Sequence, residues 1–477
     1  MKRVVVAHYF GATAKSHRVV ATLCADLADQ GLDVHLLDLD NFGVIRQEHP
    51  PRWITQIVGH RSYRQKFEAI LTGLGVTIHQ LVPVASSSVS MSAREKEEFD
   101  TAVESELLTY FRRENLEPAS RWIRKLRLLL HRNGSACFAS VSSALEATRP
   151  DLVLVPNGRT SRQKAVRIAA EKQSVPVEFY ENGRARAESY YRGKTQPHDR
   201  LASQEEVPHV VSTLERAEIR KLATSWLDAR TTSGSGTNSF SARWDAAAAT
   251  AKAAEGETAV FFTSSADEFL AFGPMWHIDC WETQFQAFDL VMDLLEARGV
   301  SLLLRVHPNL TKKSRRYFKK AVSELRQLQH RHPSLDIIWH TARTNSYDLV
   351  RSATYVIAER STIGLEANLM GKPVWINQAS QWDLVADVRQ ILEPPEVTNE
   401  NLSTWTVDTR GAEDFVAYWM LQEKPLRYGW EEFTTWDPES PPPLLRVAKL
   451  LTRNPWWHRW QLLLIETSQR ANARSRF

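Results

Sequence analysis

The sequence is poor in cysteine and contains no long apolar run, and both absences limit what the chain can be. Its three cysteines are far apart among 477 residues and form no C-x-x-C pair, which excludes a disulfide framework and a recognisable zinc site and favours a reducing cytoplasm. No window approaches the ~18 apolar residues that a membrane-spanning helix needs. The apolar run at the start ends at His8, too early for a signal peptide. We therefore expect a cytoplasmic protein, at most peripheral at the inner face of the cell membrane.

An excess of charge of one sign is also missing. The chain has 60 basic and 56 acidic residues, a net charge of +4, and this balance argues against bulk binding of nucleic acid. What the sequence does have is length and aromatic residues, including 16 tryptophans. At about 150 residues per domain the length predicts two to four domains, each able to fold without a disulfide or metal.

The hydrophobic pattern alternates between strand and helix periods in both halves of the chain. Residues 3–8 form a β-branched run, residues 16–30 place apolar side chains on one helical face, and residues 34–39 form the next strand. The same order returns after residue 258. Because parallel strands need a helical crossover, this order predicts an α/β fold with two Rossmann-like domains. Ligands of such sheets bind beyond the carboxyl ends of the strands, so we expect the domains to face one another across a cleft.

A change of composition between about residues 231 and 256 marks the predicted domain boundary. This segment is rich in Gly, Ser, Thr and Ala and has almost no large aliphatic residue, so it has little surface to bury. A loop that covers the substrate is the alternative. We predict an N-terminal domain over 1–235, a C-terminal domain over 257–442 and a helical, basic aromatic tail over 443–477.

The stretch from Glu359 to Ala367 follows a predicted strand and opens a helix. Ser361 and Thr362 fall at or near the N-cap, where backbone N–H groups and the helix dipole favour an anion. Gly364 would let the backbone approach a ligand, and Glu366 lies one turn further, within reach of a ribose hydroxyl. The alternative is an ordinary capped helix with a capping or solvated glutamate.

Two more loops are predicted at the same edge of the C-terminal sheet. Arg305, His307 and Pro308 end one strand, and Ser264 and Ser265 follow another. Because proline cannot extend a central strand, His307 is fixed at the strand's carboxyl end, where a histidine can donate to a phosphate or protonate a leaving group. The alternatives are that His307 only caps its loop, and that Asp267 or Glu268, which follow Ser265, cap a helix. Together the loops predict a nucleotide-phosphate pocket that needs no metal ion and no cofactor.

The His-Pro dipeptide, the Ser-Thr pair at a helix start and the later Gly371-Lys372-Pro373 resemble the nucleotide-binding half of GT-B-fold glycosyltransferases. The likeness is strongest to bacterial capsule-polysaccharide-synthesis transferases and to CMP-sugar-using transferases of the sialyl or Kdo type. It covers mainly residues 258–377. It implies that the C-terminal domain holds a nucleotide sugar, with a CMP-sugar favoured, and that the N-terminal domain holds a cell-surface polysaccharide or glycolipid acceptor.

The resemblance also implies a catalytic carboxylate in an acidic-acidic-Gly motif of the N-terminal half. The corresponding stretch here is Glu181-Asn182-Gly183, which differs at its second position. Glu181 is the first candidate base, because it ends a strand and partial burial would raise its pKa. His17 is the second, because UDP-sugar members of the fold place a basic histidine in the first βα loop. The alternatives are a solvated glutamate and an exposed histidine.

Clusters of basic residues predict where an acceptor or a membrane could bind. Arg159 and Arg162 lie in a loop that suits an anionic acceptor, or simply a solvated face. Residues 121–128 are basic and amphipathic, and from Arg446 to Arg476 seven basic residues face one acid and are interleaved with tryptophan and leucine. Such a helix can lie on an anionic membrane, or it can pack its aromatics on the core.

Three functions follow from these patterns. The first is a glycosyltransferase with a nucleotide-sugar donor, a glycan or glycolipid acceptor, peripheral membrane contact and no nucleic-acid partner. The second is a UDP-sugar transferase or sugar-nucleotide epimerase of the same fold. The third is a non-catalytic scaffold, which the altered acidic pair would suit.

Overall fold

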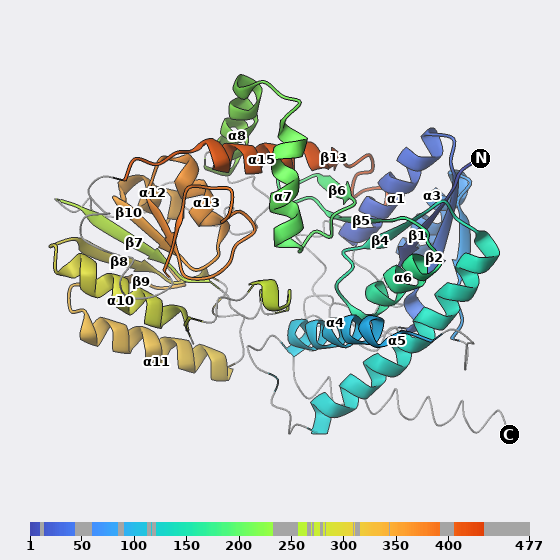
Figure 1. Cartoon of the computed structure of the whole chain (residues 1–477), viewed down its shortest axis with the longest axis horizontal. Coiled ribbons are helices and arrows are strands. Elements are labelled where there is room, and N and C mark those ends of the chain that lie inside the picture. The colour runs from blue at the N-terminus through green and yellow to red at the C-terminus, as the bar shows by residue number, and fades with distance from the viewer. Residues whose placement is uncertain are drawn as a thin grey trace. The chain divides into compact units, whose positions relative to one another are not determined.

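The computed structural model divides the chain into two compact units. It describes residues 1–9, 14–42, 60–83, 90–111, 116, 121–231, 256–264, 269, 271–276, 280–281, 283–308, 310, 315–342, 344–391 and 405–433. Unit 1 comprises the described residues among 1–110, 116–182 and 425–477, and unit 2 those among 111–115 and 183–424. Each unit contains a parallel sheet with helices on it (Figure 1), which confirms the predicted α/β class.

Unit 1 is built on five parallel strands in the order β5-β4-β1-β2-β3. The β-branched run after Lys2 is fully buried as β1, because helices cover both of its faces. The strands are β1 (Arg3–His8), β2 (Asp33–Asp38), β3 (Thr77–Gln80), β4 (Leu152–Pro156) and β5 (Val177–Asn182), and the helices are α1 (Ala14–Asp29), α3 (His60–Gly73), α4 (Ala93–Phe111), α5 (Arg121–Thr148) and α6 (Ser161–Lys172).

The chain returns to unit 1 after passing through unit 2. The backbone N–H of Arg427 donates to Thr22 Oγ1 at 3.0 Å, and Arg18 Nε donates to the carbonyl of Tyr428 at 2.8 Å. The Arg18 guanidinium also lies 4.4 Å from the ring centre of Trp430. Residues 425–433 therefore belong to unit 1, whereas the sequence placed everything up to residue 442 in the second domain.

Unit 2 contains six parallel strands in the order β12-β11-β10-β7-β8-β9. The chain runs from β7 outward to β9 and then returns to β10, on the other side of β7. Parallel sheets bind ligands at such a switch point, beyond the carboxyl ends of the two central strands. The strands are β7 (Thr258–Phe262), β8 (Ser301–Arg305), β9 (Asp336–Ile338), β10 (Tyr355–Ala358), β11 (Val374–Ile376) and β12 (Arg389–Gln390).

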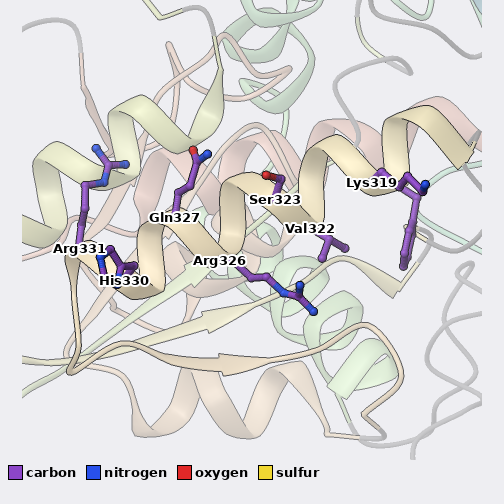
Figure 2. A pocket seen from close by; sticks show the side chains of 8 residues that line it. Lys319, Val322, Ser323, Arg326, Gln327, His330 and Arg331 are labelled. Atoms are coloured by element: carbon purple, nitrogen blue, oxygen red, sulfur yellow. The ribbon is translucent and has the colours of Figure 1, made fainter.

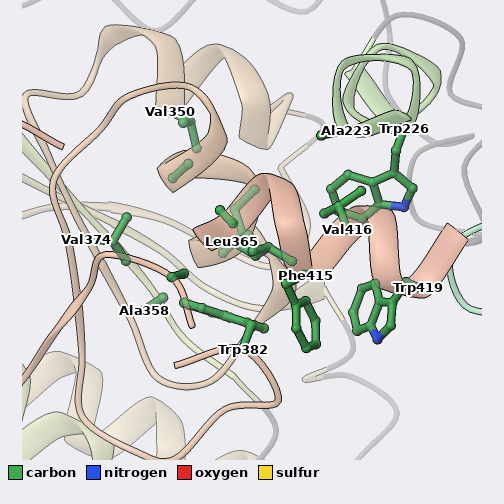
Figure 3. Close-up of a cluster of buried hydrophobic side chains, with 14 of the residues drawn as sticks. Ala223, Trp226, Val350, Ala358, Leu365, Val374, Trp382, Phe415, Val416 and Trp419 are labelled. Atoms are coloured by element: carbon green, nitrogen blue, oxygen red, sulfur yellow. The ribbon is translucent and has the colours of Figure 1, made fainter. Parts of the chain in front are cut away.

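Apolar clusters lie on both faces of this sheet. One cluster joins the sheet to α10 (Gln284–Glu296) and α11 (Arg315–Arg331). The other joins it to α12 (Ser346–Ser352), α13 (Thr362–Leu369) and three further helices (Figure 3). Those three are α7 (Arg200–Val211), α8 (Arg216–Thr231) and α15 (Arg410–Gln422). Unit 2 also holds β6 (Ser189–Gly193) and the first two residues of its neighbour β13 (Glu423–Pro425).

The packing of α7 and α8 explains where the units divide. Trp226 of α8 contacts Trp419 of α15 with ring centres 6.3 Å apart, and Trp419 in turn lies 4.8 Å from Phe415. These helices therefore share the core of unit 2, and the division falls after Asn182 rather than between residues 235 and 257. The glycine- and serine-rich segment that suggested the later boundary lies outside the described residues, as does the tail over 443–477.

A buried histidine joins α10 to the chain that follows α11. His332 is 1% exposed; its Nδ1 lies 2.8 Å from Glu296 Oε2 and its Nε2 lies 2.9 Å from Asp289 Oδ1. Burial lowers the pKa of His332, but hydrogen bonds and charge from the two acids outweigh it, so the net shift is upward.

This arrangement predicts a stability that depends on pH. A raised pKa in the folded state means that the contribution of His332 is complete below about pH 6.5 and is lost as pH rises through the folded pKa. We expect His332→Gln to cost about 2 kcal/mol at pH 5 and less at pH 9. Urea midpoints of both proteins across this range measure the effect, and parallel pH profiles would contradict it.

Candidate functional site

The carboxyl ends of β7 and β8 bring the predicted residues Ser264 and His307 together with Thr263 and Gln284. The backbone N–H of His307 donates to Thr263 Oγ1 at 2.8 Å, and the backbone N–H of Ser264 donates to Gln284 Oε1 at 3.0 Å. All four side chains line a cavity of about 20 Å³, which has room for one water molecule. Pro308, which follows His307, is half-buried, and Ser265 lies outside the described residues.

Arg305 has a structural role that differs from the predicted ligand contact. It is 4% exposed, and its guanidinium donates to the carbonyl of Trp339 at 2.7 Å and to that of Ala342 at 3.0 Å. Burial lowers the pKa of Arg305 to about 10. The two hydrogen bonds to backbone carbonyls fix the chain beyond β9.

The start of α13 has the predicted cap. Ser361 is the N-cap, and its hydroxyl accepts from the N–H of Ile363 at 3.4 Å; Thr362 is the first helical residue. Both are partly exposed. Gly364 packs against Trp382, because a Cβ there would lie 2.7 Å from this tryptophan, which is 1% exposed. The missing side chain makes room for this tryptophan.

Glu366 is placed inside unit 2. It is 2% exposed, and Arg230 Nε of α8 donates to its carboxylate at 2.6 Å. Burial raises the pKa of Glu366, while Arg230 opposes the shift. The structure thus gives this carboxylate a partner within the protein in the position where the sequence predicted a ribose contact.

Polar groups that the sequence analysis did not select lie beyond β10 and β11. Asn377 follows β11, is 0% exposed, and neither its amide nitrogen nor its amide oxygen has a hydrogen-bond partner in the structure. The Ser380 hydroxyl is equally buried and without a partner. Arg360 donates from Nη1 to the carbonyl of Trp276 at 3.0 Å, while its Nε has no partner. The sequence signal that could have identified Asn377 was its position directly after the apolar strand β11.

A buried ion pair fixes the segment that carries Asn377 and Ser380. Arg200 Nη2 lies 2.7 Å from Asp383 Oδ2, and the side chains are 9% and 0% exposed. Arg200 Nε also donates to the carbonyl of Ser380 at 3.0 Å, and Gln204 donates to Asp383 at 3.1 Å. The segment after β11 is therefore anchored to α7.

In unit 1, the predicted base His17 is fully buried. Its ring lies 4.3 Å from that of Phe67 and 5.0 Å from that of His8. Burial lowers the pKa of His8 to about 3, against the charge of Asp40. Burial around His8 thus favours its neutral imidazole.

Glu181, the other predicted base, is partly exposed near the end of β5. The chain that follows is tightly fixed within unit 2, because the Glu423 carboxylate accepts from the N–H groups of Ala185 at 2.7 Å and Arg186 at 2.9 Å and from the Ser189 hydroxyl at 2.6 Å. A Cβ on Gly183 would lie 1.8 Å from that hydroxyl. The glycine of the predicted motif is therefore required by local packing.

The predicted acceptor residues Arg159 and Arg162 both have partners in unit 1. Arg159 Nη1 donates to Thr109 Oγ1 at 2.7 Å. The Arg162 guanidinium lies 4.2 Å from the ring centre of Tyr9, and its Nη1 donates to the carbonyl of Leu39 at 3.3 Å. Both stay partly exposed.

The basic helix α5 packs its apolar face inside unit 1, where Ile123, Leu126 and Leu130 are buried. That face is therefore not open to a membrane. Among the described residues no helix combines the length and apolar character needed to cross a membrane, and the same residues contain no group of three His, Cys, Asp or Glu side chains placed to hold a metal ion.

Comparison with known proteins gives remote likenesses only. No family model matches the sequence, and no curated protein matches it. Solved structures that match include KpsC of Thermosulfurimonas dismutans, a beta Kdo 2,4 transferase (15% identity, 56% of this chain and 79% of that chain, TM-score 0.35). The MnaA–UDP structure of S. aureus is 12% identical (87% and 91% covered, TM-score 0.31). A putative UDP-N-acetylglucosamine 2-epimerase from Listeria monocytogenes is also 12% identical (87% and 90% covered, TM-score 0.28). Similarity at this level transfers neither a substrate nor a catalytic residue to this chain.

Proposed function

We propose that the protein is a glycosyltransferase that moves a sugar from a nucleotide-activated donor, a CMP-sugar, to a cell-surface polysaccharide or glycolipid at the inner face of the cell membrane. The observation that carries the proposal is the set of buried polar groups at the carboxyl edge of the unit 2 sheet. Asn377 and Ser380 have hydrogen-bonding atoms without partners, and such atoms cost about 1–3 kcal/mol each unless a ligand or water pairs with them.

The position of these groups supports a nucleotide donor in particular. They lie beyond β10 and β11, beside the switch point between β7 and β10. The partly exposed N-terminus of α13 at Ser361 and Thr362 suits a phosphate, and so does His307 at the end of β8. In this proposal the helix end and the histidine stabilise the departing phosphate, and no metal ion or further cofactor is required.

Transfer also needs a base for the acceptor hydroxyl. We propose Glu181 for this role, because it is partly exposed whereas His17 is fully buried. A fully buried histidine reaches an acceptor only if the surrounding chain opens.

The nucleotide assignment is tested by thermal unfolding of the full chain and of Asn377→Leu. We expect CMP to raise the Tm of the wild type and UDP to leave it unchanged; a ligand at 100 times its Kd adds about 2.7 kcal/mol. Asn377→Leu removes unpaired buried polar atoms, so its Tm without ligand should equal or exceed that of the wild type, while the increase with CMP should disappear.

Asn368→Leu is the matched control. Asn368 is also fully buried and its amide oxygen has no partner, but its amide nitrogen donates to the carbonyl of Asp387 at 2.7 Å. It should lower the Tm and keep the CMP response. Protection by UDP alone would overturn the CMP assignment, and protection by no nucleotide would favour a scaffold. A lower Tm in Asn377→Leu with an unchanged CMP response would give the asparagine a structural role.

A further inference from the structure

The outer face of α11 is a basic surface that the proposed donor site does not use. The helix carries six lysine and arginine residues and one acid, Glu324. Ala321, Leu325 and Leu328 are buried against unit 2. The opposite side of the helix is exposed, and eight of its residues line an open groove along it (Figure 2), namely Phe318, Lys319, Val322, Ser323, Arg326, Gln327, His330 and Arg331.

The charges in this groove are only partly neutralised. Arg331 pairs with Asp289 of α10, and Lys320, on the edge of the groove, lies 3.8 Å from Glu324. Lys319, Arg326 and His330 have neither an ion-pair nor a hydrogen-bond partner in the part of the chain that the structure describes, and all three are exposed. At 1.5 Å per residue, Lys319 and Arg326 are about 10.5 Å apart along the helix axis, and Arg326 and His330 about 6 Å apart.

We propose that this groove binds a linear anionic polysaccharide. Lys319 and Arg326 place two positive charges along one helical face, which match negative charges repeated along a polymer. Ser323, Gln327 and His330 offer the donors and acceptors that sugar hydroxyls need.

Two other polyanions fit this face less well. A membrane-binding helix presents exposed tryptophan, phenylalanine or leucine beside its cations, and none of the exposed large apolar side chains of the described residues lies on α11. Single-stranded nucleic acid is held largely by bases that stack on exposed aromatic rings, and the only aromatic residue among the groove's described lining, Phe318, is half-buried.

The test measures binding of a fluorescein-labelled oligogalacturonate to the full chain by anisotropy, without donor. We expect Lys319→Glu/Arg326→Glu to weaken binding about tenfold or more, and Lys319→Arg/Arg326→Lys to keep it. The control Lys221→Glu/Lys424→Glu reverses the same charge at two other exposed positions of unit 2 and should change the Kd less than twofold.

Several results would overturn the inference. The first is equal weakening in the control variant, and the second is an unchanged Kd in the α11 variant. The third is tighter binding of phosphatidylglycerol vesicles or of oligo(dT) than of the oligogalacturonate, if that binding depends on Lys319 and Arg326. Because no nucleotide is present, failure of the donor assignment leaves the result of this experiment unaffected. A neutral dextran of the same length should not bind at all.

Discussion

Asp383→Ala is expected to lower the stability of unit 2 by about 3–5 kcal/mol, because it leaves the buried Arg200 without its counter-charge. The guanidinium contacts both carboxylate oxygens, at 3.0 and 2.7 Å, and Gln390 adds a hydrogen bond to the same carboxylate at 3.1 Å. Arg200 is only 7% exposed, so its guanidinium has little access to solvent. For a unit of this size the loss corresponds to a fall in Tm of about 10 °C, which calorimetry of the full chain would measure.

The surface pair Arg410–Asp408 is the matched control for this prediction. Its atoms are also close, at 2.6 Å, but the side chains are 73% and 47% exposed, and exposed pairs of this kind contribute little. Asp408→Ala should therefore leave the Tm unchanged. A Tm of Asp383→Ala within two degrees of the wild type would mean that water reaches the Arg200 guanidinium and that the pair does not anchor the chain after β11.

The elements nearest the central strands were predictable because their cause is local. The predicted strand at 3–8 matches β1 residue for residue, because an uninterrupted β-branched run between polar turns is typical of a buried strand. The cap at Ser361 was predictable for the same reason, because an N-cap depends on residues within one turn.

The division into units was not predictable, because it depends on contacts between distant segments. The apolar faces of α7 and α8 pack on α15, which follows them by almost two hundred residues, as in the contact of Trp226 with Trp419. A composition change near residue 235 carries no information about such a partner. The return of residues 425–433 to unit 1 has the same origin.

The positions of the candidate site residues were predictable, and the ligand contacts assigned to them stay predictions. Ser264, His307 and Ser361 lie at the edge of the sheet that the strand order predicted. Arg305 and Gly364 lie there too, but the first fixes backbone carbonyls and the second makes room for Trp382. Residue type and spacing do not distinguish a side chain that binds a ligand from one that hydrogen-bonds or packs within the protein, because the same side-chain groups make both kinds of contact.

Glu366 gives the sharpest test of that distinction. If its carboxylate serves Arg230, as the 2.6 Å contact between side chains 7% and 2% exposed indicates, Glu366→Ala leaves a buried guanidinium unpaired and should cost about 3–5 kcal/mol. The affinity for CMP, measured by calorimetry well below the Tm of the variant, should then stay within twofold of the wild type. A ribose contact predicts the opposite, with little loss of stability and a weakening of about tenfold or more.

The double variant Arg230→Met/Glu366→Leu separates the contribution of the ion pair to stability from that of side-chain packing. Replacing both members of a buried ion pair by apolar residues of similar volume is often neutral, whereas removing one is costly. We expect the double variant to recover most of the Tm lost in Glu366→Ala, with a coupling energy of about 2–3 kcal/mol between the two positions. The Arg230 guanidinium also lies 4.7 Å from the ring centre of Trp226, so Arg230→Met keeps an apolar contact there. Additive losses in the two single variants would show that the carboxylate and the guanidinium act separately, and the carboxylate would then be available to a ligand.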